Sequence, residues 1–184
     1  MKKYLSILVA VILFTSCKKD DHLHPHDDNE LITRVELTFI NNATNAISKY
    51  TFQDNDADPK TAPEKFDKIV LNKGVTYTMS IEVFDDTKSP AKDITEEIDE
   101  ESDVHLFVYK TTPATLLKTT IQDVDKNGLP IGLTAKVEAS STAGTGKLNV
   151  LLKHQPVLNG VKVKTGQEAG GSTDIDLTFD LEVK

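Results

Sequence analysis

The stretch TDIDLTFDLEV, residues 173–183, sets apolar and polar side chains in strict alternation. Its odd-numbered positions from 175 onward are apolar and its even-numbered positions are polar: Ile175, Leu177, Phe179, Leu181 and Val183 alternate with Asp174, Asp176, Thr178, Asp180 and Glu182. Because successive side chains of a strand point to opposite faces of a sheet, a period of two predicts a strand with one buried face and one solvated face.

The same alternation recurs throughout the chain from Leu31 onward. It is found in RVELTFIN (34–41) and VTYTMSIEVF (75–84), and shorter runs follow in HLFVYK (105–110), LLKTTIQD (116–123), LTAKVEAS (133–140) and KLNVLLKH (147–154). Turn signals such as Asn127-Gly128 separate the runs. The pattern predicts an all-β fold. We expect an antiparallel immunoglobulin-like or transthyretin-like β-sandwich of about eight to nine strands, with one short acidic helix.

The helix is predicted within DITEEIDEESDVH, residues 93–105, which interrupts the strand pattern. Asp93 and Thr95 are candidate N-caps for it. The acidic residues that follow suit the positive end of a helix dipole. One or two turns of helix, crossing between strands, are expected there.

The composition limits the classes of function. The chain has 184 residues, enough for one domain with a real core, and its formal net charge is −8. An acidic domain repels nucleic acid, so we expect no nucleic-acid partner. The sequence has no G-x-S-x-G, no glycine-rich phosphate loop and no H-E-x-x-H. We therefore expect a protein that is not an enzyme.

The first residues have the layout of a bacterial lipoprotein signal. Lys2 and Lys3 form a basic start, residues 4–14 are mostly apolar, and Thr15 and Ser16 precede Cys17, which is the only cysteine. The apolar run is too short to span a bilayer stably. This layout predicts a signal peptide over residues 1–16, and the residues before Cys17 resemble the lipobox of bacterial lipoproteins. The resemblance implies cleavage before Cys17 and acylation of its sulfur and of the new amine. Removal of Lys2 and Lys3 lowers 21 basic residues to 19 against 29 acidic residues, a net charge of −10.

Residues 17–30 then read as the lipidated cysteine followed by a disordered tether rich in His and Asp. Its three histidines, at alternate positions, are candidate ligands for Zn²⁺, Cu²⁺ or Ni²⁺: His22, His24 and His26. A tether must lose conformational entropy on binding, so its affinity should be modest. The alternative is a solvated segment whose histidines bind nothing.

A second candidate metal site combines the predicted helix with two strand ends. Glu97 and Glu101 are four residues apart on one helix face, and His105 continues that step. His105 also opens an apolar run, whereas His154 ends another in LLKHQP. If those strand ends meet, two imidazoles and a carboxylate form a three-ligand site with an open position, as catalytic zinc sites have. The alternative is two unrelated histidines.

DVDKNG, residues 123–128, resembles the first half of an EF-hand calcium loop, with Asp123, Asp125 and Asn127 as ligands. The twelfth position of an EF-hand loop is normally a glutamate that binds the ion through both oxygens, but here it would be Thr134. Predicted strands rather than helices flank the segment. The favoured interpretation is a hairpin turn stabilised by its Asp side chains. The acidic loop DNDAD, residues 54–58, is a further candidate for Ca²⁺, with a solvated loop as its alternative.

Two resemblances to known proteins add to this interpretation. Lys19-Asp20-Asp21, directly after the predicted lipidated cysteine, resembles the surface-export signal of Bacteroidota lipoproteins. The stretches ELITRVELTF, FQDNDADP, DVDKNGLPIGL and GGSTDIDLTFDLEV, together with the long run from VTYTMSIEVF to VHLFVY, resemble a family of small, mostly uncharacterised Bacteroidota lipoproteins. The resemblance implies lipidation, one β-domain over residues 31–184 and an outer-membrane location facing the cell surface, with the periplasmic face as the alternative. It implies no reaction.

Two functions therefore remain open at the level of sequence. The first is a surface lipoprotein that binds a divalent metal or metal complex, for example on behalf of an outer-membrane transporter. The second is a structural or interaction module that packs against an envelope protein or a glycan. An exposed apolar patch or a long unpaired edge strand would favour the second.

Overall fold

A computed structural model describes residues 31–56 and 60–184 as two facing β-sheets with one short helix. The larger sheet has seven strands, in the order β3-β2-β1-β5-β9-β8, with β6 paired to β5. Its strands are β1 (Arg34–Asn41), β2 (Ile47–Gln53), β3 (Lys65–Phe66), β5 (Thr76–Asp85), β6 (Lys92–Asp93), β8 (Leu117–Ile121) and β9 (Thr134–Ala139). All of its pairings are antiparallel.

The smaller sheet has four strands in the order β4-β13-β10-β7. They are β4 (Ile69–Leu71), β7 (His105–Thr112), β10 (Gly144–His154) and β13 (Ser172–Val183). The pairing of β4 with β13 is parallel and the others are antiparallel. A separate two-stranded hairpin consists of β11 (Val157–Leu158) and β12 (Val161–Lys162).

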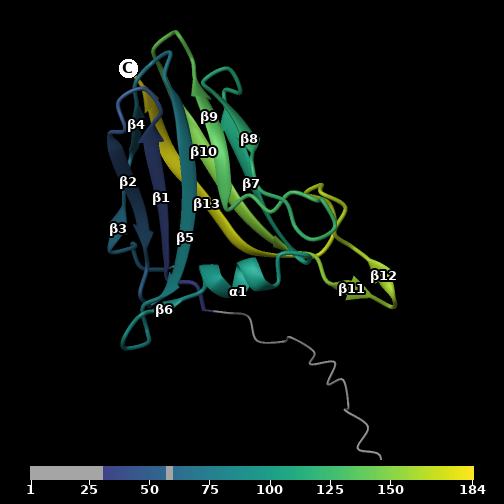
Figure 1. The fold of residues 1–184 in the computed structure, drawn as a ribbon. Coiled ribbons are helices and arrows are strands. Elements are labelled where there is room, and N and C mark those ends of the chain that lie inside the picture. Colours follow the sequence, from purple (N-terminus) through teal and green to yellow (C-terminus); the bar gives the residue numbers. More distant parts are fainter. Residues whose placement is uncertain (1–30, 57–59) are drawn as a thin grey trace, which may run out of the picture.

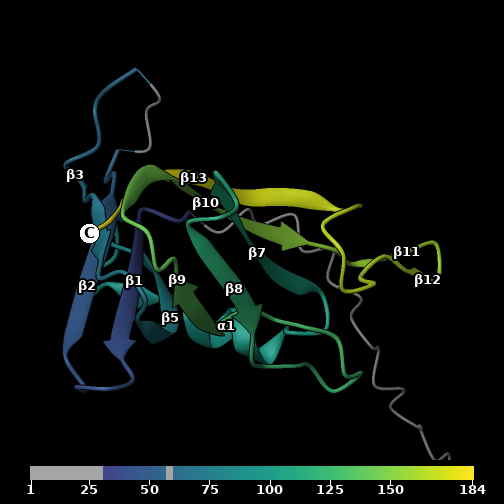
Figure 2. The same ribbon diagram turned by 90° about the horizontal axis from the view of Figure 1, so that it is seen from above.

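The two large sheets form the two layers of the molecule, as the view from above shows (Figure 2). The prediction of an all-β architecture with facing sheets is confirmed at this level. The described part of the chain holds thirteen strands rather than eight or nine. Five of the thirteen have only two or three residues, and eight have five or more. Sequence alternation detects long strands, because a period of two is not visible in a two-residue bridge.

The core lies between the sheets and comes from alternate positions of the long strands. Val35, Leu37 and Phe39 of β1 are fully buried, and Phe179 and Leu181 of β13 face them from the other layer. Burial of one such apolar side chain contributes about 1.5–3 kcal/mol. The alternation in residues 173–183 therefore corresponds to a strand whose apolar side chains face the core and whose polar side chains face solvent.

Helix α1 (Thr95–Glu100) lies across one end of the two layers (Figure 1). It buries Ile98 completely, and Ile94, just before it, is 1% exposed. The predicted capping is wrong in detail, because Ile94 is the N-cap and has no side-chain cap bond. Asp93 instead accepts a hydrogen bond from the Thr95 amide at 2.8 Å. No helix among the described residues is long and apolar enough to cross a membrane.

Candidate functional site

The two histidines of the domain meet where β7 begins and β10 ends. These strands are antiparallel neighbours, and His105 and His154 are direct partners in their register. The imidazole rings stack with centroids 4.9 Å apart and planes 21° apart. His105 is 8% exposed and His154 is partly buried. The register of two strands therefore brings together residues that are 49 positions apart in the sequence.

Strand β13, the other neighbour of β10 in this sheet, adds a carboxylate to the pair. One ligand atom each from His105, His154 and Asp174 lie within 4.8 Å of one another. Asp174 is the extra residue of a β-bulge in β13, because Leu152 pairs with Ile175 while Lys153 pairs with Thr173. A bulge commonly re-aims a side chain at a functional site.

The approach of β13 to the end of β10 depends on a glycine. Gly171 has a φ of +68°, and a Cβ there would lie 2.0 Å from the carbonyl oxygen of His154. Gln155, next along the chain and 1% exposed, donates from Nε2 to the carbonyl oxygens of Gln167 at 2.9 Å and Ala169 at 2.8 Å. These contacts hold the connection between β10 and β13 against the strand end that carries His154.

The ring of His105 is oriented by the end of helix α1. Its Nδ1 lies 3.2 Å from the carbonyl oxygen of Glu101. In the tautomer with hydrogen on Nδ1, the ring donates to this carbonyl and the lone pair lies on Nε2. Metal-bound histidines are commonly fixed in this way by a backbone carbonyl on the second nitrogen.

The ligand atoms of this cluster lie farther apart than those around a bound Zn²⁺ ion. A tetrahedral Zn²⁺ ion with bonds of about 2.0–2.1 Å holds its ligand atoms about 3.3 Å apart. The separation of up to 4.8 Å in this cluster requires closure by at most about 1.5 Å. Asp174 is exposed, so side-chain rotation can supply much of that closure. Three protein ligands leave one position open.

The predicted helix carboxylates do not join this cluster. The carboxylate of Glu97 forms an ion pair with Lys92 at 2.7 Å. The backbone carbonyl of Glu101 contacts the His105 ring. Among the described residues, the cluster of metal-ligand type contains Asp174 in place of both glutamates.

The candidate calcium residues of DVDKNG bind groups of the protein instead. Asp125 Oδ2 pairs with the ammonium of Lys164 at 2.9 Å, and the two side chains are 0% and 2% exposed. Asp125 Oδ1 accepts from the amides of Asn127 at 2.8 Å and Leu129 at 3.0 Å. Burial alone would raise the pKa of Asp125, but these hydrogen bonds and the Lys164 charge together lower it.

The other two residues of the motif have similar roles. Asp123 accepts hydrogen bonds from the amides of Gly132 at 2.8 Å and Thr134 at 2.9 Å. Asn127 Oδ1 accepts from Lys162 Nζ at 3.0 Å. The contacts favour the hairpin-turn interpretation, in which lysine ammonium groups supply the positive charge.

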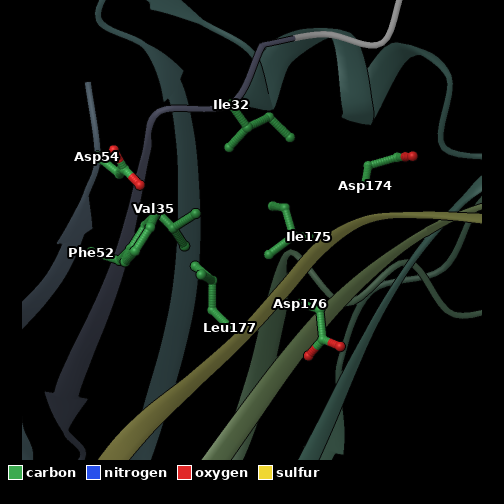
Figure 3. A pocket seen from close by; sticks show the side chains of 8 residues that line it. All are labelled: Ile32, Val35, Phe52, Asp54, Asp174, Ile175, Asp176 and Leu177. Carbon is green, nitrogen blue, oxygen red and sulfur yellow. The ribbon is translucent and has the colours of Figure 1, made fainter. Parts of the chain in front are cut away.

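A small pocket lies beside Asp174, between the two layers (Figure 3). Its volume is about 220 Å³, and its lining is Ile32, Val35, Phe52, Asp54, Asp174, Ile175, Asp176 and Leu177. Ile175 and Leu177 point toward Val35, whereas the carboxylates of Asp174 and Asp176 point away from this apolar group (Figure 3). Drug-sized ligands occupy about 300–1,000 Å³, so this pocket is too small for one.

Several predicted site residues lie outside the described part of the chain. They are the lipidation residue, the export signal and the tether histidines: Cys17, Lys19, Asp20, Asp21, His22, His24 and His26. Asp58 of the acidic loop is also outside it. Asp54 lines the pocket, and Asp56 accepts a hydrogen bond from the Thr61 hydroxyl at 3.0 Å.

Two residues were not identified from the sequence. Asp174 has the position of a solvent-facing residue in the alternation, and only the bulge reveals its place beside the histidines. Lys164 lies in a polar connection, and nothing in its neighbours signals burial. Gly170-Gly171 before β13 is the single local signal of a close backbone approach.

No protein family, no curated protein and no solved structure matches this chain. The function is therefore inferred from the residues themselves and from their geometry.

Proposed function

We propose that this chain is a non-enzymatic envelope lipoprotein that binds a divalent transition metal, Zn²⁺ or Cu²⁺, through His105, His154 and Asp174. The observation that supports it is the approach of three ligand atoms from three strands to within 4.8 Å. Two imidazoles and one carboxylate suit Zn²⁺ and Cu²⁺, whereas Ca²⁺ prefers oxygen ligands alone.

The open fourth position determines what the site does. A site built to hold its metal permanently uses four protein ligands, whereas three ligands leave room for water or for a donor from another molecule. Such a site can bind a metal complex, or release its metal to a transporter that offers further ligands. We place this role at the outer membrane, with a transporter or another envelope protein as the partner.

The envelope location is part of the proposal and rests on the N-terminal sequence. In this proposal Cys17 is the acylated residue, and Lys19-Asp20-Asp21 is the signal for export to the cell surface. Membership of the Bacteroidota lipoprotein family that the sequence resembles belongs to the same proposal. The assignment of the sandwich to an immunoglobulin-like or transthyretin-like type is also part of the proposal.

Calorimetric titration of the full chain with ZnCl₂ tests the metal site. The tether histidines are first removed by His22→Ala, His24→Ala and His26→Ala, so that only the domain can respond. We expect a dissociation constant in the micromolar range or below in this background, and at least a tenfold loss on His154→Ala. The matched control is Asp176→Asn, two residues along β13, which should bind as the parent does.

Each other outcome contradicts a defined part of the proposal. No heat and no rise in melting temperature with Zn²⁺ or Cu²⁺ in the background variant would exclude the folded site. Binding that vanishes only when the tether histidines are removed would assign the metal to the tether. Equal losses on Asp174→Asn and Asp176→Asn would show general attraction to an acidic surface.

The second candidate function is a structural or interaction module. Three aliphatic side chains at the tip of the β11–β12 hairpin, Val157, Leu158 and Val161, are more than half exposed. Apolar side chains gathered on a projecting element are typical of a contact surface.

A further inference from the structure

The β11–β12 hairpin presents an apolar tip that the sandwich does not cover. Val157 is 55% exposed, Leu158 is 54% exposed and Val161 is 66% exposed. Asn159 and Gly160 join the two strands with φ values of +51° and +77°. Two consecutive residues with positive φ form the tight turn that Asn-Gly favours in hairpins. The turn places Leu158 and Val161 directly opposite each other on one face of the hairpin, and Val157 pairs with Lys162 next to them.

Polar contacts join the base of this hairpin to neighbouring loops. Lys164, two residues after β12, donates to the carbonyl oxygen of Ser102 at 2.6 Å and pairs with Asp125. Lys162 donates to Asn127 Oδ1 at 3.0 Å. These contacts fasten β12 to the loop of residues 123–128. The tip therefore projects from a fixed base (Figure 1).

The hairpin lies at the end of the sandwich where the chain enters the domain. The described chain begins at the end of the sandwich where α1, β11 and β12 lie, whereas the C-terminus is at the opposite end (Figure 1). Thirteen residues lie between Cys17 and Leu31. They span at most about 50 Å when fully extended. An acyl group on Cys17 would thus keep a bilayer within reach of this end.

We propose that the apolar tip of the β11–β12 hairpin inserts into the lipid bilayer that carries the anchor of this chain. The inference depends on the proposed acylation of Cys17, but not on metal binding. A bilayer accepts a small, projecting apolar tip, because each inserted side chain leaves water independently of any matching surface. A stable protein partner requires about 800 Å² from each side, so it would have to contact more of the domain than three side chains on a hairpin with two residues in each strand. The tip then serves as a second membrane contact besides the acyl chains.

The absence of tryptophan from the chain gives a direct test. Leu158→Trp and Val161→Trp each place a single fluorophore at the tip, in the full chain recovered from membranes and reconstituted in phosphatidylcholine vesicles. The control is Ile47→Trp. Ile47 is 68% exposed and pairs with Ile40, at the end of β1 that is distant from Leu31. Lipids brominated along their acyl chains quench a tryptophan that enters the bilayer.

We expect at least a twofold loss of fluorescence for both tip variants and no loss for Ile47→Trp. Equal fluorescence of all three variants in brominated and ordinary vesicles would overturn the inference while leaving the anchor intact. Protection of the tip variants from an aqueous quencher without quenching by brominated lipid would also overturn it, and would indicate a protein contact. If the chain does not float with the vesicles, the anchor itself fails and the insertion with it. Zinc titration of the same samples reports separately on the metal site.

Discussion

Replacement of Lys164 by methionine should destabilise the domain strongly, although the residue lies in a connection between strands. Its side chain is 2% exposed and pairs with that of Asp125, which is 0% exposed. Without the ammonium, the carboxylate remains buried, and the Ser102 carbonyl loses its donor. Removal of one partner of a buried ion pair costs about 3–5 kcal/mol. The amides of Asn127 and Leu129 still bind Asp125, so we expect the lower limit, about 3 kcal/mol.

Urea unfolding followed by circular dichroism measures this loss. For a domain of this length, about 3 kcal/mol corresponds to a melting temperature lower by about 6–12 °C. The double variant Asp125→Asn/Lys164→Met removes both charges, so it should lose less than the sum of the two single variants. The control is Lys118→Met. Lys118 is 77% exposed and lies 3.7 Å from Glu138, and an exposed pair of this kind contributes at most about 1 kcal/mol.

Two results would refute the reasoning. If Lys164→Met costs no more than Lys118→Met, the buried pair does not contribute to folding as the geometry indicates. If the losses of the two single variants simply add in the double variant, the two side chains do not interact in the folded state.

Two further predictions concern the backbone and acid stability. Gly171→Ala should cost at least about 2 kcal/mol more than Gly160→Ala in urea unfolding, because its Cβ meets the His154 carbonyl at 2.0 Å whereas nothing lies within 4 Å of Gly160. Equal losses of stability for the two variants would show that positive φ, and not the close contact at Gly171, determines the cost of both substitutions. The pKa of Asp125 is lowered in the folded chain, so its contribution to stability is complete above about pH 4 and is lost as the pH falls through the lowered pKa. Asp125→Asn should therefore flatten the decline of the urea midpoint below about pH 4, and an unchanged slope would contradict the assignment.

The candidate site was only partly predictable from the sequence. His105 and His154 stand at the start and the end of recognisable strands, so their meeting was a definite hypothesis, and the structure places them side by side. Helical spacing is visible in a sequence, so it predicts Glu97 or Glu101 as the third ligand. A β-bulge is not visible there, and it is the bulge that brings Asp174 to the histidines.

By itself, the sequence determined the class of the fold. The period of two along residues 173–183 and in the other long strands requires sheets with one buried face, and the Gly- and Asn-containing turns separate them. Tertiary structure alone decided the order of the strands, the short bridging strands and the partners of Asp125 and His105. Alternation fixes which face of a strand is buried, but it carries no information about which strand lies next to it. Contacts between residues that are distant in the sequence depend on which strands are neighbours in the sheet. The candidate metal site is one such contact, because it requires β7, β10 and β13 to lie side by side.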